Sequence, residues 1–169
     1  MKLLGASAVL CSCLGMSLTA LRTARERIRC LFWLCRAAEA IRAELSTRLS
    51  PLPGLMRLAA GRTKGACRSF FEETANGLAD LSERSFYELW ADSARKRLPF
   101  LPEEVRDELL QLGLSLGRYE LQEQLAACDR FLNAVTPLLG EESRSLREKR
   151  RVYLALGTAA GAFLCLLFL

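Results

Sequence analysis

The chain has 169 residues, no histidine, a formal net charge of +5 and a pI near 9.0. Without histidine it cannot form a Ser/His/Asp or Cys/His nucleophile arrangement, a histidine general base or the usual histidine-containing zinc site. When its apolar ends are set aside, about 120 residues remain, which is enough for one modest domain.

The first predicted element is a transmembrane helix over residues 1–21. Lys2 is followed by uncharged residues up to Arg22, a run long enough to cross a bilayer. A cleaved signal peptide would begin in the same way. A secreted protein normally avoids dense positive charge just after its signal, however, and arginines follow here at 22, 25, 27 and 29. We therefore expect a retained membrane anchor.

Beyond this anchor the helix is predicted to continue to about Arg48, with apolar residues spaced by three and four positions. These are Leu31, Leu34, Ala38, Ile41 and Leu45. The sequence SPLPG then breaks the helix. Two further helices are expected at 52–60 and 66–81, on either side of a basic turn.

Ser85 and Glu88 have the spacing of a capping box, which predicts a helix that begins there and ends before Pro99. The next helix begins near Pro102, with an apolar stripe and two glycines. Gly113 is expected at a close helix contact, and Gly117 is expected to stop the helix. A last helix starts near Tyr119, is interrupted near Pro137 and Gly140, and continues into a second apolar segment.

No stretch alternates with the two-residue period of a strand. Short loops between adjacent helices favour antiparallel packing. The predicted fold is therefore all-α, with an antiparallel helical bundle over residues 22–151 placed between an N-terminal and a C-terminal transmembrane helix.

The second transmembrane helix is predicted over residues 152–169, which are uncharged. As a helix they would span about 27 Å, close to the roughly 30 Å hydrocarbon core of a bilayer. Basic residues precede this segment at 144, 147, 149, 150 and 151. Because basic flanks stay inside, both anchors predict a cytoplasmic bundle with both termini across the cell membrane. Basic residues clustered beside apolar ends favour a membrane, and we expect no nucleic acid partner.

Small residues recur every four positions in both anchors, as is typical of membrane helices that pack closely. The candidate packing residues are Ser7, Cys11, Gly15, Gly157 and Gly161. Pairing within the hairpin and pairing in a homo-oligomer both remain open. Equally, such residues are common in membrane helices that do not pair.

The bundle sequence predicts no catalytic, cofactor-binding or metal-binding residues. GRTKG at 61–65 lacks the spacing of a phosphate-binding loop. Adjacent carboxylates such as Glu72 and Glu73 point about 100° apart on a helix and read as solvated charges. The seven cysteines contain no CxxC pair and are expected to be reduced thiols. Arg95, Lys96 and Arg97 form a basic helix end, which the helix dipole alone favours; partner docking is the alternative role.

Taken together, the order of parts resembles the stage III sporulation protein AB family, which is similar to the F-type inner-membrane platform proteins of type II secretion. The resemblance rests on five stretches in order: MKLLGA, SPLPGLMRLAA, FYELWADSA, LLQLGLSLG and KRRVYLALGTAAGAFLCLLFL. Tyr119 with Glu120, and Pro137, depart from the pattern expected of that family.

The resemblance implies a non-catalytic subunit of the channel complex between mother cell and forespore in endospore formation. It would lie in the mother-cell membrane around the forespore, with other channel-complex membrane proteins. Its bundle would dock a cytoplasmic secretion-type ATPase. The alternative is a tail-anchored helical adaptor or regulator with a cleaved or incidental N-terminus, and retention of the N-terminus separates the two.

Overall fold

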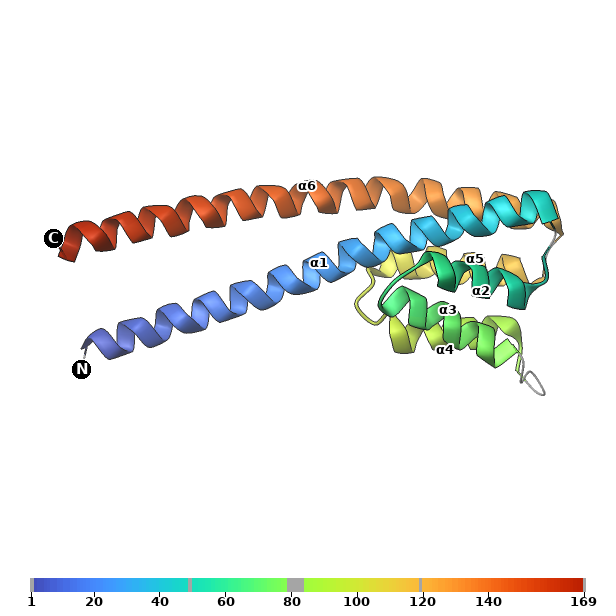
Figure 1. Cartoon of the computed structure of the whole chain (residues 1–169), viewed down its shortest axis with the longest axis horizontal. Helices are drawn as coiled ribbons and strands as arrows, with labels where there is room; N and C mark the ends of the chain where they lie inside the picture. Colours follow the sequence, from blue (N-terminus) through green and yellow to red (C-terminus); the bar gives the residue numbers. More distant parts are fainter. Residues whose placement is uncertain (1, 49, 79–83, 119, 169) are drawn as a thin grey trace. The chain divides into compact units, whose positions relative to one another are not determined.

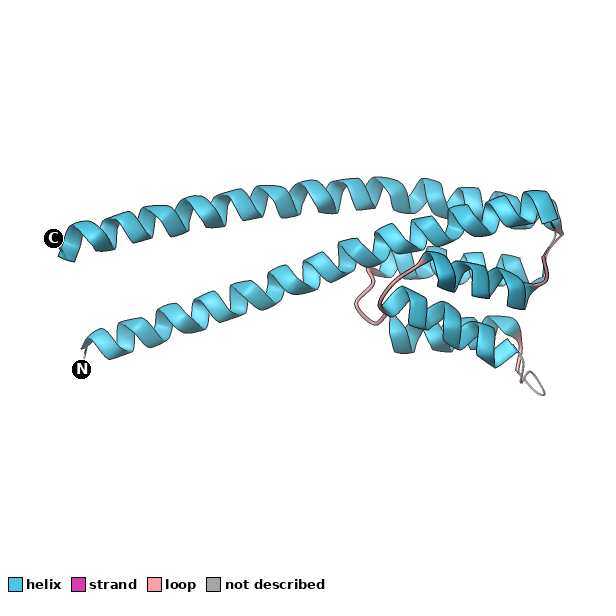
Figure 2. Cartoon of the chain, in the orientation of Figure 1, coloured by secondary structure: helices cyan, strands magenta, loops and turns pink. Residues whose placement is uncertain are grey.

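The computed structural model describes the backbone of residues 2–48, 50–78, 84–118 and 120–168. Side chains are described for residues 23–48, 50–78, 84–117 and 120–148. Over the described backbone the regular elements are all helices, which confirms the all-α class (Figures 1 and 2). They are α1 (Lys2–Arg48), α2 (Leu52–Arg62), α3 (Ala66–Gly77), α4 (Phe86–Arg97), α5 (Glu103–Arg118) and α6 (Leu121–Phe168).

The chain divides into two compact units. One consists of Met1–Arg25 with Gly140–Leu169, and the other, which we call the bundle, is Glu26–Leu139. All six helices contribute buried apolar side chains to the core of the bundle. The predicted stripe of α1 is confirmed, since its five residues are at most 3% exposed. The α5 stripe is also buried, at Val105, Leu109, Leu112 and Leu116.

Trp90 of α4 lies at the centre of this core and is fully buried. Its ring packs on Phe70 of α3, with centroids 4.7 Å apart, and on Phe86, at 5.6 Å. The indole Nε1 donates a hydrogen bond of 2.8 Å to the carbonyl oxygen of Leu109 in α5. A buried indole N–H needs such a partner, so this bond fixes the ring against α5.

Two glycines of α5 make room for aromatic rings of α4. A Cβ atom added at Gly113 would lie 2.3 Å from Cδ1 of Trp90, and one added at Gly117 would lie 2.8 Å from Cδ1 of Phe86. The close contact predicted at Gly113 is confirmed. Gly117 also permits a close contact, and α5 ends one residue after it, at Arg118.

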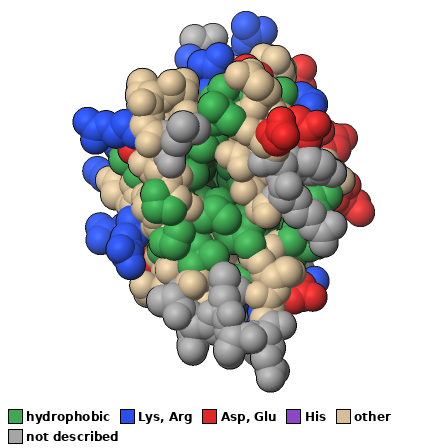
Figure 3. Space-filling model, turned by 90° about the vertical axis from the view of Figure 1, so that its right-hand side faces the viewer, with side chains coloured by type: hydrophobic (Ala, Val, Ile, Leu, Met, Phe, Trp, Pro, Cys, Tyr) green, Lys and Arg blue, Asp and Glu red, His purple; other side chains and the backbone are tan. Residues whose placement is uncertain are grey.

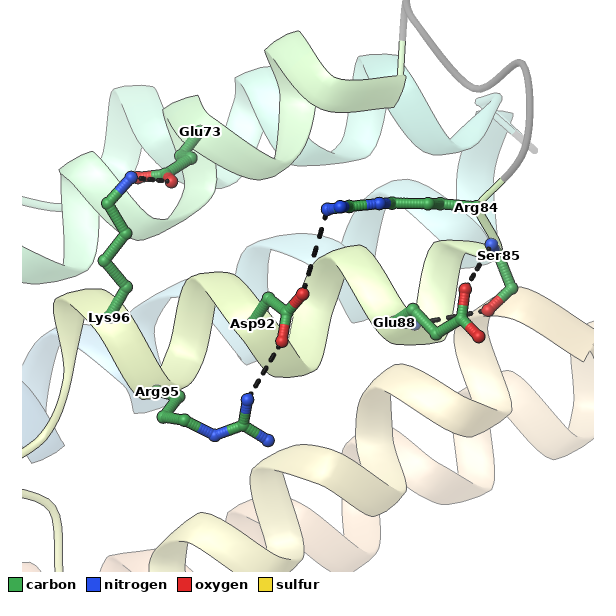
Figure 4. Close-up of polar contacts among 7 residues, drawn as sticks. All are labelled: Glu73, Arg84, Ser85, Glu88, Asp92, Arg95 and Lys96. Atoms are coloured by element: carbon green, nitrogen blue, oxygen red, sulfur yellow. Dashed lines mark hydrogen bonds and ion pairs between the residues drawn. The ribbon is translucent and has the colours of Figure 1, made fainter.

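The capping box that begins α4 is confirmed (Figure 4). The Glu88 backbone N–H donates to Ser85 Oγ at 3.3 Å, and the Ser85 N–H donates to the Glu88 carboxylate at 3.0 Å. Two amide groups left unpaired at the helix start are thereby satisfied. The preceding helix, α3, ends at Gly77 rather than near residue 81 as predicted. Residues 79–83 lie outside the described part of the chain.

The predicted interruption near Pro137 and Gly140 is wrong, because α6 continues through both residues. Proline removes the hydrogen bond to the carbonyl four residues earlier, which belongs to Asn133. Pro137 and Asn133 are both exposed. Water can therefore satisfy that carbonyl, and the helix is not forced to end.

Among the residues whose side chains the structure describes, no helical segment is long and apolar enough to cross a membrane. The spans predicted at 1–21 and 152–169 lie outside those side chains. So do the candidate packing residues Ser7, Cys11, Gly15, Gly157 and Gly161.

The contact between Gly113 and Trp90 predicts that Gly113→Ala lowers the free energy of unfolding by about 1–3 kcal/mol, because the fully buried indole would have to shift to admit the added methyl group. Gly61→Ala is the matched control, since nothing lies within 4 Å of an added Cβ there. It should raise stability by about 0.5–1 kcal/mol through helix propensity. Denaturant unfolding of the full chain in detergent, followed by circular dichroism, measures both. Equal stability of the two variants would contradict the contact.

Candidate functional site

Arg95, Lys96 and Arg97 occupy the last turn of α4, before the chain leaves the helix at Leu98. Cations are stabilised there by the partial negative charge of the helix end. All three side chains are accessible, with exposed fractions of 79%, 63% and 43%. The structure thus brings the predicted docking residues together on one exposed helix end.

Two of these cations are engaged by Glu73 of α3. Lys96 Nζ lies 2.7 Å from Glu73 Oε1, and Arg97 Nε lies 2.5 Å from Oε2. Figure 4 shows Glu73 and Lys96 facing one another across the two helices. Hydrogen bonds from Lys96 and then Arg97 hold the pKa of the Glu73 carboxyl below its ordinary value. This triplet ties the C-terminal end of α4 to α3.

The sequence did not predict that Glu73 pairs with the basic end of α4, because its position beside Glu72 indicates a solvated charge. Its partners are more than 20 positions away, so no local spacing links them. Only the antiparallel packing of α3 on α4 brings the carboxylate and the two cations together.

Arg95 is placed differently from its two neighbours. Its guanidinium lies 3.0 Å from Asp92 on the same helix, and Asp92 also lies 3.9 Å from Arg84 (Figure 4). Exposed ion pairs of this kind contribute about 0–1 kcal/mol, so a partner carboxylate could displace Asp92 at little cost. Arg95 is therefore the residue of the three best placed to bind an acidic partner.

A second surface feature is a cleft of about 620 Å³ lined by residues of α1, the α2–α3 turn, the start of α3 and the α4–α5 loop. Its wall includes Phe32, which at 41% is the exposed large hydrophobic side chain among the described residues. Trp33 and Phe100 also line it, and the Lys64 ammonium lies 5.7 Å from the Trp33 ring centre. Two cysteines, Cys30 and Cys67, complete the lining.

A third feature is the end of the bundle where α1 ends and α2 begins. Figure 3 shows hydrophobic side chains gathered in the middle of this face, with Lys and Arg mainly along one edge and Asp and Glu along the other.

In the described part of the chain, no three metal-binding side chains lie close enough together to hold a metal ion. The four cysteines whose side chains are described are free thiols in this structure. Burial, followed by the nearby Asp129 carboxylate, raises the pKa of Cys128 to about 12. The thiol of Cys128 is therefore a packing group in the core and a poor nucleophile.

Comparison with known proteins agrees with this fold. A solved structure described as "Stage III sporulation protein AB (SpoIIIAB)" superposes with a TM-score of 0.64 at 20% sequence identity. The match covers 72% of this chain and 97% of that one. At this level of identity the likeness supports the fold alone. No curated protein sequence matches the chain.

The family model described as "Stage III sporulation protein AB (spore_III_AB)" matches residues 2–169. The resemblance carried by the five sequence stretches is thereby confirmed, and membership implies a role in sporulation. Because the match extends over nearly the whole sequence, the chain belongs to the stage III sporulation protein AB family.

Proposed function

We propose that this chain is a non-catalytic platform subunit of a secretion-like channel complex between mother cell and forespore. The observation that carries the proposal is the family match over residues 2–169, which includes the bundle and both apolar segments. The bundle would lie in the cytoplasm of the mother cell and bind a cytoplasmic secretion-type ATPase. Other membrane proteins of the complex, or further copies of this chain, would contact the membrane helices.

The membrane part of the proposal rests on the apolar segments 1–21 and 152–169 and on the basic residues beside them. Both basic clusters lie on the bundle side of the apolar segments. Basic residues close to a membrane helix remain on the cytoplasmic side. A hairpin that presents the bundle to the cytoplasm is the arrangement that satisfies both clusters.

The docking part rests on the surface of the bundle. The basic end of α4 projects Arg95 into solvent, while Glu73 holds the neighbouring cations in place. An acidic patch on a partner could bind Arg95 without disturbing the packing of α3 on α4. We therefore place the first contact with the ATPase at this helix end.

The hairpin predicts that a reporter enzyme active only outside the cytoplasm gives a signal when it is fused after Leu169, and that a reporter active only in the cytoplasm gives none. A reporter inserted in the 79–83 segment should show the opposite behaviour. The intact mass of the membrane-extracted protein should include residues 1–21, because a cleaved N-terminus would indicate the adaptor instead. A cytoplasmic signal from the Leu169 fusion would rule out the hairpin.

The docking site predicts that Arg95→Glu weakens binding of the purified ATPase to the full chain in nanodiscs by about 5- to 30-fold, the effect of losing 1–2 kcal/mol. The loss should shrink at high salt because the contact is electrostatic. Arg68→Glu is the matched control, since Arg68 of α3 is also exposed and also pairs with an acid of its own helix, Glu72. Equal affinities for the two variants would remove α4 from the docking surface.

The candidate packing face predicts that Gly157→Leu with Gly161→Leu leaves the chain in the membrane but lowers recovery of associated subunits after detergent extraction. Leucine favours insertion, while its side chain prevents close approach of helix backbones. The control is Ala155→Leu with Ala159→Leu, which adds similar though slightly less bulk to another helix face. If both double variants recover the same amount of partner, the glycine face has no special packing role.

A further inference from the structure

Cys30 of α1 and Cys67 of α3 form a close sulfur pair inside the bundle. Both are buried, with exposed fractions of 4% and 1%. Their Sγ atoms are 2.8 Å apart. Non-bonded carbon atoms rest at roughly 3.5–4.0 Å, and sulfur is larger than carbon. The two sulfurs therefore lie closer than an ordinary non-bonded contact and less than about 1 Å beyond the roughly 2.05 Å of a disulfide bond.

We propose that Cys30 and Cys67 are a site of reversible disulfide formation that links α1 to α3. The co-reactant is a small organic disulfide such as oxidised glutathione. One cysteine thiolate attacks a sulfur of the oxidant and releases the first small thiolate. The second cysteine thiolate then attacks the mixed disulfide and releases the other. In the balance, two cysteine thiols become one disulfide, the oxidant becomes two thiols, and the protons pass from the cysteines to the products.

Both cysteines are among the residues that line the cleft described above. Because they are only 4% and 1% exposed, the oxidant would reach the sulfurs from this cleft when the bundle opens locally. Arg29 and Lys64 also line the cleft, with Glu26 as the acidic residue there. Two cations against one carboxylate favour an anionic reagent such as glutathione, which carries carboxylates. The cleft therefore supplies a modest electrostatic attraction beside the two buried sulfurs.

The local environment also determines how fast the reaction proceeds. The hydrogen bond with Cys67, followed by burial and by the charge of Cys67, raises the pKa of Cys30 well above its usual value. Thiolate is the attacking species, so oxidation should be slow at neutral pH. Its rate should rise by about tenfold for each pH unit while the pH stays below the pKa of the attacking thiol. The site would respond to a sustained oxidising poise rather than to a brief pulse.

The proposed bond would close a loop that contains α2 and both of its connections. A cross-link of this kind reduces the freedom of the unfolded chain. The oxidised protein should unfold at a temperature about 5 °C or more above the reduced protein, and a dithiol reductant should reverse the shift.

The test uses the full chain in detergent, exposed to oxidised glutathione at pH 7 and pH 9. Remaining thiols are then alkylated, and tryptic peptides are mapped without reduction. The expected product joins residues 30–36 to residues 65–68 and forms faster at pH 9. Because Cys35 shares the first peptide, the experiment is repeated in Cys35→Ser, which should leave the product unchanged.

Cys67→Ser should abolish the linked peptide, whereas Cys128→Ala, which removes another fully buried thiol, should retain it. The peptide map of the oxidised chain without substitutions tests the proposal even if Cys67→Ser folds poorly. Recovery of both cysteines as free thiols would overturn the proposal. So would pairing of Cys30 with Cys35 or Cys128 as often as with Cys67.

Discussion

The indole of Trp90 fills the space that Gly113 leaves open, and its N–H binds the Leu109 carbonyl one helical turn earlier. Phe70, Phe71 and Phe86 surround the same ring. One side chain therefore sets how closely α4 approaches α5 and contributes to the packing of α3 on α4. A larger residue at position 113 would displace the indole from its acceptor and from its aromatic neighbours at the same time.

The packing around Trp90 also fixes the positions of the charged side chains on α3 and α4. With α3 and α4 fixed by Trp90, Glu73 lies within reach of Lys96 and Arg97 and offsets one of the three positive charges at this helix end. Arg95 is left on the outer side with Asp92. Three consecutive cations in the sequence are thus placed unequally in the fold. The proposed contact with a partner is therefore centred on the guanidinium of Arg95.

Features with a local cause could be predicted from the sequence. The capping box of Ser85 and Glu88 and the apolar stripe of α1 each depend on residues a few positions apart. The close contact at Gly113 could be predicted because a glycine inside a helix lowers the stability of that helix and so needs a reason to be there. Features that join distant segments could not be predicted. Glu73 with Lys96, and Cys30 with Cys67, meet only after the helices pack. Pro137 was misjudged because its effect depends on whether water reaches the Asn133 carbonyl, which exposure in the folded chain decides.

The positions of the two tryptophans give the protein a pair of built-in optical reporters. Trp90 is sealed in the core with a fixed hydrogen bond, so its emission should be blue and should change when the bundle opens. Trp33 lines the cleft beside Lys64 and close in sequence to Cys30, so its emission should respond to occupancy of the cleft and to nearby sulfur chemistry. Tryptophan fluorescence can thus report both on loss of the fold and on events at the cleft, without any added label.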